Sequence, residues 1–265
     1  MPAQSLPLPA SGPAIAFERV AKVYADGTVA LDGVSLTVAP GSFVALVGPS
    51  GSGKSTLLRT VNRLVAPSDG RVTIDGEDVA AGPPHLLRRR IGYVFQEVGL
   101  FPHLSVAENV ALPLRVAGRR DPARVSAMLD LVDLPAALAS RLPAALSGGQ
   151  RQRVGVARAL VTGPRLLLMD EPFGALDPVT REALMRSVLR LHRELALTTV
   201  MVTHDMAEAL LAADRVLVME RGRLVADETP AALLAGAGGA TAAALVAVPR
   251  AQGERLAALA RGAQA

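Results

Sequence analysis

Hydrophobic and polar positions divide most of the chain into three parts. Between residues 14 and 90, short apolar runs are separated by turn-rich segments such as YADG and DGEDVAAGPP, which is typical of an antiparallel sheet. Between residues 104 and 160, apolar residues recur three and four positions apart, which indicates helices. From 165 to 220, short apolar runs alternate with helical patterns. We therefore expect an α/β fold: a parallel core with an antiparallel β subdomain and an inserted helical subdomain.

The two ends of the chain depart from this pattern. Residues 1–13 lack the basic start and the continuous apolar run of a secretory signal, so we expect a flexible leader. Residues 231–265 are rich in Ala and Gly and predict a short helical tail with a Gly-rich joint and a final amphipathic helix. The uncharged stretch 229–249 is long enough to span a membrane. It is mostly Ala and Gly between Pro230 and Pro249, so two short helices are expected there instead.

Composition excludes some classes of protein. A chain of 265 residues can form the core of one or two domains without cross-links, and the absence of cysteine excludes disulfides and thiolate metal sites. The net charge of +4 comes from scattered basic residues, all arginine except Lys22 and Lys54. Because these charges do not gather into one patch, we expect no nucleic-acid partner.

The segment SFVALVGPSGSGKSTLLRTVNRL carries the first chemical motif. An apolar strand at 42–47 leads through a Gly-rich turn into a helix, with GxxxxGK[ST] matched at Gly48, Gly53, Lys54 and Ser55. In such a loop the backbone N–H groups surround a β-phosphate, and the lysine supplies positive charge to the β- and γ-phosphates. The serine hydroxyl is a ligand for Mg²⁺. The segment therefore predicts a nucleotide site.

A metal-holding acid is expected at the end of a neighbouring buried strand. PRLLLMDEPFGALDP supplies one: the apolar run 166–169 ends in Asp170 and Glu171. A continuous apolar run is typical of a parallel strand covered on both faces. We expect Asp170 to bind Mg²⁺, directly or through water, and Glu171 to polarise the attacking water as a general base. Both carboxylates would also suit a metal site alone, which leaves the base role of Glu171 open, and an acidic turn at the end of a strand is the structural alternative for the pair.

A second anion site is predicted at AALSGGQRQRVGVARAL, which contains no nucleophile, metal cluster or paired carboxylates. Ser147 is a good N-cap, and Gly148 and Gly149 let a ligand approach the backbone N–H groups at the positive end of the helix dipole. One chain thus carries two separate anion-binding segments.

Taken together, the motifs resemble those of the nucleotide-binding subunits of ATP-binding cassette (ABC) transporters. The likeness runs from about residue 14 to residue 230, which we take as one ATPase domain with its helical subdomain at about 104–160. In family order, GPSGSGKS matches the Walker A loop, YVFQ the Q-loop, LSGGQ the signature, LLLMDE the Walker B strand, GALD the D-loop and VTHD the switch histidine. The resemblance implies a P-loop fold of ABC type that binds ATP and Mg²⁺.

The resemblance also implies a role for each matching position. Three positions match catalytic residues of the family: Glu171, His204 and Gln96. Three match its metal ligands: Ser55, Gln96 and Asp170. The nucleotide contacts are Tyr24, Gly48, Pro49, Ser50, Gly51, Ser52, Gly53, Lys54, Ser55, Thr56, Ser147, Gly148, Gly149, Gln150 and Asp177.

Two of these positions keep a structural alternative. Tyr24 matches the aromatic residue that stacks on adenine, but a strand residue that only packs would look the same. Asp177 matches a residue that positions the partner's active site across the dimer interface, but it is also a suitable cap for a helix beginning at Pro178.

In the family, two copies face each other head to tail, and ATP on one Walker A loop is covered by the signature of the other copy. This chain has one of each motif, so we expect a homodimer. The other expected partners are integral membrane permease subunits and, through the complex, a substrate-binding protein. The resemblance places the chain peripherally at the cytoplasmic face of the inner membrane.

The segments TVNRL and EVGLFPHLSVAENVALPL resemble importer ATPases for quaternary amines such as glycine betaine, choline or proline. We therefore expect the chain to power osmoprotectant uptake. Some such ATPases append a pair of CBS domains that sense ionic strength, and this sequence ends before such a pair, so regulation by salt and the choice of cargo are both left open by the resemblance.

Other functions remain open. The chain would also suit an importer of amino acids or other small solutes, or an exporter. A soluble ABC ATPase of DNA repair or of ribosomes is disfavoured, because the sequence has no long coiled coil between the Walker motifs and no second cassette. A non-catalytic ATP-binding regulator is disfavoured by the intact Glu171, His204 and LSGGQ.

Overall fold

The computed structural model describes residues 11–262. The expected leader therefore lies mostly outside the described residues. Its last part is held against the body, because the Gly12 amide donates to the Ala196 carbonyl at 2.7 Å and Thr198 Oγ1 donates to the Pro13 carbonyl at 2.7 Å.

A four-stranded antiparallel sheet forms the β subdomain. Its strand order is β2-β1-β4-β5, and a turn closed by the Tyr24 amide on the Thr28 carbonyl joins β1 to β2. A short helix, α2 (Pro84–Arg89), follows the sheet. The strands are β1 (Ile15–Val23), β2 (Val29–Val38), β4 (Asp69–Ile74) and β5 (Glu77–Asp78).

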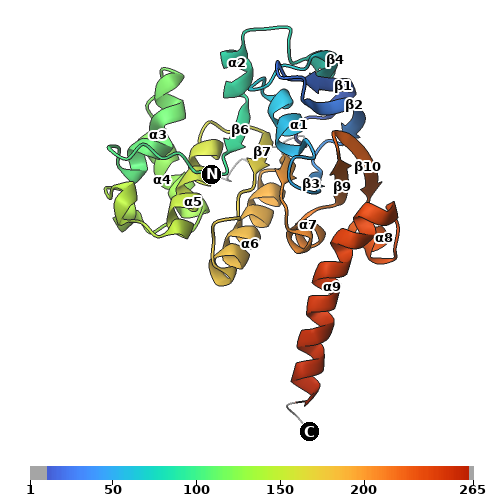
Figure 1. The fold of residues 1–265 in the computed structure, drawn as a ribbon. Helices are drawn as coiled ribbons and strands as arrows, with labels where there is room; N and C mark the ends of the chain where they lie inside the picture. The colour runs from blue at the N-terminus through green and yellow to red at the C-terminus, as the bar shows by residue number, and fades with distance from the viewer. Residues whose placement is uncertain (1–10, 263–265) are drawn as a thin grey trace, which may run out of the picture.

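A six-stranded sheet of order β10-β9-β3-β8-β7-β6 forms the centre of the molecule (Figure 1). Neighbouring strands are parallel except for the β9–β10 hairpin. The strands are β3 (Phe43–Val47), β6 (Ile91–Val94), β7 (Leu166–Asp170), β8 (Thr198–Val202), β9 (Arg215–Glu220) and β10 (Arg223–Glu228). The helices of this core are α1 (Lys54–Val61), α6 (Pro178–Glu194) and α7 (Met206–Ala212).

The two faces of the central sheet are both covered, as a buried parallel sheet requires. Leu166 and Leu168 of β7 pack into one hydrophobic cluster with α1 and the antiparallel sheet, whereas Leu167 and Met169 pack into the cluster that includes α6 and a further helix, α5 (Gly148–Leu160). Because side chains alternate between faces along a strand, Asp170 continues the first row. The carboxylate is thus directed to the face that carries α1.

The helical subdomain consists of α3 (Val106–Val116), α4 (Pro122–Leu131) and α5 (Gly148–Leu160), with single 3₁₀ turns at Ala136–Leu138 and Pro143–Ala145. These helices contact one another and lie to the left of β6 and β7 in Figure 1. Ser105 caps α3 in a reciprocal box with Glu108, in which each residue accepts a hydrogen bond from the other's backbone N–H.

The C-terminal part contains α8 (Pro230–Leu234) and α9 (Gly239–Gly262). Two helices do begin between Pro230 and Pro249, but the expectation that both are short is wrong, because α9 runs through Pro249. Proline removes one backbone hydrogen bond, but tertiary contacts hold the helix on both sides of it. Val246 is buried in the core, and the Arg250 guanidinium donates to the carbonyl of Leu234.

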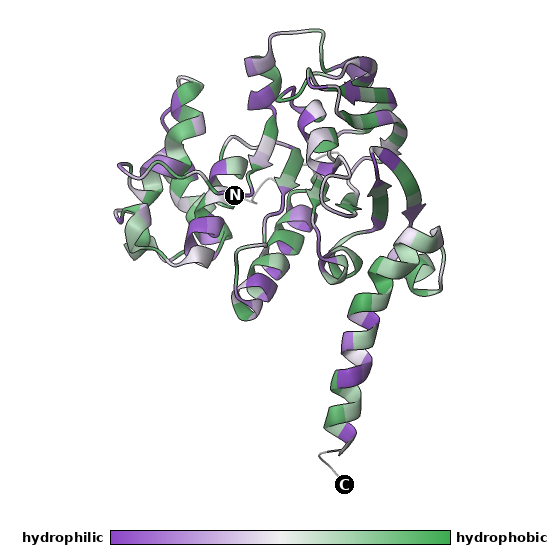
Figure 2. Cartoon of the chain, viewed as in Figure 1, coloured by the Kyte–Doolittle hydropathy of each residue, from purple (hydrophilic) through white to green (hydrophobic). Residues whose placement is uncertain are grey.

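Beyond these contacts, α9 projects from the body (Figure 1), and Figure 2 shows hydrophilic and hydrophobic residues mixed along the projecting part. Within residues 11–262, no helix combines the length and the apolar character needed to cross a membrane.

Candidate functional site

Residues 48–53 form the loop that joins β3 to α1. Gly48 and Gly53 have φ values of 145° and 100°, which side chains rarely allow. A Cβ on Gly48 would lie 2.1 Å from the carbonyl oxygen of Met219, and one on Gly53 would lie 2.3 Å from that of Ala30. Glycine is therefore required at both positions by the strands around the loop.

Lys54 lies buried over this loop. Its Nζ donates to the carbonyl oxygens of Gly48 and Pro49, at 2.8 and 2.9 Å, and lies 3.3 Å from Ser52 Oγ. Burial lowers the pKa of Lys54, while the carboxylates of Glu171 and Asp170 oppose that shift. A cation held over a loop of backbone amides suits a bound phosphate.

Asp170 is buried, with 1% of its surface exposed, and accepts hydrogen bonds from three side chains. Ser55 Oγ donates to Oδ1 at 2.7 Å, and Arg59 Nη2 and Tyr93 Oη donate to Oδ2 at 2.9 and 3.2 Å. Burial, together with the Asp170 charge, raises the pKa of Tyr93 to about 12, so its hydroxyl remains a donor at neutral pH. Three hydrogen bonds thus hold the carboxylate beside Ser55 in the first turn of α1.

Sequence reasoning missed two of these three donors. Arg59 lies four residues after Ser55 on α1, and residues at that spacing share one face of a helix. Tyr93 lies on β6 opposite Leu168 of the neighbouring strand. The helical spacing could have found Arg59, but only the strand order places Tyr93 near Asp170.

The structure brings the three predicted catalytic side chains together. Gln96 Nε2 donates to Glu171 Oε2 at 3.0 Å, and His204 Nδ1 lies 3.3 Å from the same oxygen. The three residues follow β6, β7 and β8, and the carboxyl ends of parallel strands meet at one edge of a sheet. Glu171 has a φ of 46°, a strained value for a residue with a side chain.

Tyr24 lies at the edge of this region. The residue is 41% exposed, its Oη lies 3.5 Å from Thr56 Oγ1 of α1, and Lys22 Nζ lies 5.3 Å from the ring centroid. An exposed aromatic ring beside the helix that carries Lys54 and Ser55 offers a face for a base to stack on.

The predicted second anion site lies at the start of α5. The Gln150 amide donates to Ser147 Oγ at 3.2 Å, and the Ser147 amide donates to Gln150 Oε1 at 2.9 Å, which closes a capping box. Ser147 and Gly148 are exposed, whereas Gly149 is buried. A Cβ on Gly149 would lie 2.2 Å from Thr180 Cγ2 on α6. The missing side chain at Gly149 therefore serves helix packing, and the exposed part of the site is Ser147 and Gly148.

We expect Gly149→Ala to destabilise the fold by about 1–3 kcal/mol, because an added methyl group overpacks the contact between α5 and α6. Thr180→Ser removes Cγ2 and keeps the hydroxyl, so the double variant should regain most of that stability. Urea unfolding of the wild type, both single variants and the double variant measures the coupling. If Gly149→Ala costs as much stability in the Thr180→Ser background as in the wild type, the packing role is contradicted.

The two anion sites do not meet within one chain. Figure 1 shows α5 and α1 on opposite sides of β6 and β7. Among the described residues, no hydrogen bond joins 147–150 to 48–56. The two predicted anion-binding segments are therefore separate within one chain.

Asp177 caps α6. Its Oδ1 accepts from the amides of Val179 and Thr180, at 3.1 and 3.0 Å, and the hydrogen bonds from Thr180 lower the pKa of Asp177. Asp177 therefore caps the helix within one chain, and these two hydrogen bonds use only Oδ1.

The donors present fit Mg²⁺ bound together with a nucleotide. The Ser55 hydroxyl and the Asp170 carboxylate lie 2.7 Å apart at the mouth of the loop. No group of three or more His, Cys, Asp or Glu that could hold a metal occurs in the part of the chain that the structure describes. Mg²⁺ commonly takes one or two protein oxygens and completes its shell with phosphates and water. A hydroxyl and a carboxylate beside a phosphate loop match that demand.

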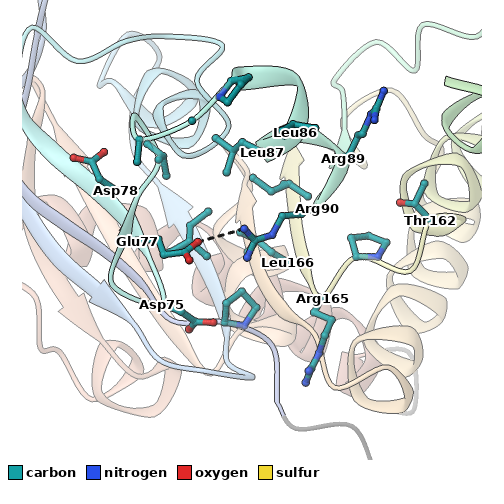
Figure 3. Close-up of a pocket in the computed structure, with 18 of the residues that line it drawn as sticks. Asp75, Glu77, Asp78, Leu86, Leu87, Arg89, Arg90, Thr162, Arg165 and Leu166 are labelled. Atoms are coloured by element: carbon teal, nitrogen blue, oxygen red, sulfur yellow. Dashed lines mark hydrogen bonds and ion pairs between the residues drawn. The ribbon is translucent and has the colours of Figure 1, made fainter. Parts of the chain in front are cut away.

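A hollow of about 730 Å³ lies elsewhere, between α2, the β4–β5 turn and residues 162–166. Figure 3 shows Glu77 and Arg90 facing each other across it, with 3.3 Å between Glu77 Oε2 and Arg90 Nη1. None of the predicted site residues lines this hollow. The chemistry described above is therefore at the sheet edge and not in this cavity.

Comparison with known proteins identifies relatives of this chain. The family model described as ABC transporter matches residues 31–174. The chain is 46% identical over 221 residues to the glycine betaine/carnitine/choline transport ATP-binding protein OpuCA of Bacillus subtilis, covering 82% of this chain and 58% of that protein. It is 51% identical over 214 residues to the sulfate/thiosulfate import ATP-binding protein CysA of Mycobacterium bovis, covering 80% and 60%. The chain thus spans about three fifths of the length of these relatives.

A solved structure is similar as well. It is the structure of the ATP-binding cassette MJ0796 in a dimeric, post-hydrolysis state bound to ADP and Pi. That chain is 36% identical in sequence to this one and superposes with a TM-score of 0.75, and the match covers 82% of this chain and 98% of that one. These comparisons confirm the resemblance and the α/β P-loop fold class predicted from the sequence. With a family model over more than half of its residues and relatives at this identity, the chain belongs to the ABC transporter family.

Proposed function

We propose that the chain is the ATP-hydrolysing subunit of an import complex for a quaternary amine such as glycine betaine or choline. The observation that carries the proposal is the cluster at the sheet edge. Gln96, Glu171 and His204 meet there. Asp170, the last residue of β7, accepts a hydrogen bond from Ser55 of α1. This set supplies a base, an orienting amide and imidazole, and ligands for Mg²⁺.

In the proposed reaction, Lys54 leaves the loop carbonyls and neutralises charge on the β- and γ-phosphates. Glu171 accepts a proton from the attacking water, and Gln96 and His204 hold the Glu171 carboxylate and the water in line with the γ-phosphate. Ser55 and Asp170, and Gln96 as the sequence predicts, would hold Mg²⁺, which stabilises charge on the phosphate oxygens when it is bound. Tyr24 would stack on the adenine.

We further propose that two copies complete the sites. Ser147 and Gly148 of one chain would contact the γ-phosphate held by residues 48–56 of the other, with Gly149 and Gln150 shaping the helix start and Asp177 facing the partner. The separation of the two anion sites within one chain supports this arrangement, and the MJ0796 cassette is dimeric. A two-fold axis makes both sites equivalent.

The proposed complex includes integral membrane permease subunits and a substrate-binding protein, with this chain held peripherally at the cytoplasmic face of the inner membrane. Closing of the dimer on ATP and its reopening after hydrolysis would alternate the access of the permease. The Bacillus subtilis relative is a transport ATP-binding protein for glycine betaine, carnitine and choline. The second candidate cargo is sulfate or thiosulfate, which the Mycobacterium bovis relative favours.

Uptake by a reconstituted complex tests the cargo. The chain and the permease and binding proteins encoded beside it are placed in vesicles loaded with ATP, and radiolabelled glycine betaine and radiolabelled sulfate are offered separately. We expect ATP-dependent accumulation of betaine, and none with Lys54→Ala. Accumulation of sulfate alone would favour the second candidate, and ATP hydrolysis without uptake of either would overturn both cargo assignments.

A further inference from the structure

Next to the loop that carries His204 is a buried acid with no role in the reaction described above. Glu208 lies in the first turn of α7 and is 5% exposed. Its Oε2 accepts a hydrogen bond from Thr203 Oγ1 at 2.5 Å, and burial raises its pKa. A buried carboxyl group is costly unless it is hydrogen-bonded or paired, so its partners indicate why it is there.

The hydroxyl of Thr203 connects Glu208 to the backbone around His204. While it donates to Glu208, it also accepts from the Asp205 amide at 3.0 Å, and the Thr203 amide donates to the Leu46 carbonyl at 3.1 Å. Both neighbours of His204 in the sequence are therefore fixed. The His204 side chain itself is 60% exposed, so its direction depends on this backbone.

Arg181 extends the network to residues 174–177, the D-loop segment. Its Nη2 donates to the Leu176 carbonyl at 3.0 Å, while Nε lies 3.6 Å from Glu208 Oε1 and Nη1 lies 3.8 Å from Asp205 Oδ2. The Arg181 guanidinium thus contacts the segment 174–177 through Leu176, and it also contacts Glu208 and Asp205, the residue after His204. No other side chain of the described residues bonds both to Leu176 and to the His204 loop.

The contact between Arg181 Nε and Glu208 is an ion pair without a hydrogen bond. Arg181 Nε is buried and has no hydrogen-bond partner among the described residues. Glu208 Oε1, at 3.6 Å, is only just beyond hydrogen-bond distance. A displacement of the segment 174–177 that brought Nε a few tenths of an ångström nearer to Oε1 would form this hydrogen bond.

We propose that Arg181 and Glu208 are positioning residues that link the D-loop segment 174–177 to the His204 loop, so that His204 reaches its working position only when that segment is in place. The inference rests on the proposed function, in which this segment faces the partner chain and His204 serves hydrolysis. It assigns these two residues a way to make hydrolysis depend on the arrival of the partner.

The test uses Arg181→Met and Glu208→Gln in the full chain, each with and without His204→Ala. Glu208→Gln keeps the shape of the side chain and can still accept the Thr203 hydroxyl, but it loses the charge that faces Arg181. We expect Arg181→Met to lower kcat about 10- to 100-fold, the scale of a misplaced catalytic group, with KM for ATP unchanged. The matched control is Arg186→Met, which removes an exposed ion pair with Glu182 from the same helix.

The double variants decide between positioning and plain destabilisation. If the two residues act through His204, neither substitution lowers the residual rate of His204→Ala further, because the interaction they serve is already lost. Single-turnover measurements with enzyme in excess over radiolabelled ATP reach those slow rates. An equal fold-loss in both backgrounds would show a general structural role and overturn the proposal.

The outcomes also separate this inference from the proposed function. Absence of ATP hydrolysis by the wild-type chain would contradict the proposed function itself. Hydrolysis by the wild type, with Arg181→Met and Glu208→Gln as active as Arg186→Met, would overturn the positioning role alone. Thermal unfolding checks each variant, and Glu208→Gln carries the test if Arg181→Met does not fold.

Discussion

Glu171→Gln is expected to lower ATP turnover by about 10²- to 10⁴-fold, the usual contribution of a general base. The amide has the shape of the carboxylate but cannot accept a proton from water. Its oxygen can still accept the hydrogen bond that Gln96 now donates at 3.0 Å. ATP binding should therefore survive, since Lys54 and Ser55 are untouched. Steady-state hydrolysis and equilibrium ATP binding, measured on the same preparation, provide the two readouts.

The matched control is Glu182→Gln. Glu182 is an exposed carboxylate on α6, paired with Arg186 at 3.6 Å, and exposed pairs contribute little to stability, so turnover should stay within about twofold of the wild type. Because the closed dimer would persist without hydrolysis, Glu171→Gln should also accumulate as an ATP-bound dimer in size-exclusion chromatography. Wild-type turnover by Glu171→Gln would show that another group serves as the base.

Mixing two inactive variants should restore ATP turnover. Lys54→Ala removes the cation that pairs with phosphate, and Ser147→Glu sets a negative charge where the partner's γ-phosphate is expected. Each homodimer then has two defective sites. In a mixed dimer, both defects fall in one site, and the other site combines an intact loop with an intact signature.

Random mixing of equal amounts makes half of the dimers mixed, so the recovered turnover should approach about one quarter of the wild-type rate for independent sites. Ser105→Glu is the matched control for the serine change, because Ser105 caps α3 through the same kind of box. It should leave turnover unchanged. Two inactive variants that show no recovery at any ratio, while mixed dimers form, would contradict a site shared between chains.

Part of the site could be predicted because its chemistry is local in the sequence. The loop at 48–53 needs glycines, a lysine and a serine at fixed spacing between a strand and a helix, and the sequence contains all of them within one short segment. Ser147 as the cap of α5 rests on the same kind of evidence, since a capping box involves residues only three positions apart. The α/β class followed from the change between strand and helix periodicity.

Local sequence patterns were insufficient where tertiary contacts determine the length of a helix or the space around a residue. The sequence predicts two short helices between Pro230 and Pro249, yet the packing of Val246 and the hydrogen bond from Arg250 to Leu234 allow α9 to continue through Pro249. Gly149 suggested an open approach for a ligand, but Thr180 of α6 occupies the space where its side chain would lie.

The sequence by itself thus determined the phosphate loop, the acids at the end of their strand and the family. Only the tertiary structure decided which side chains form hydrogen bonds with the two acids. Arg59 and Asp170 are 111 residues apart, and Gln96 and Glu171 are 75 apart. Such pairs meet because parallel strands place their carboxyl ends along one edge, in an order that crossover connections set. Short-range patterns contain no record of that strand order, whereas hydrogen bonds and packing depend on it directly.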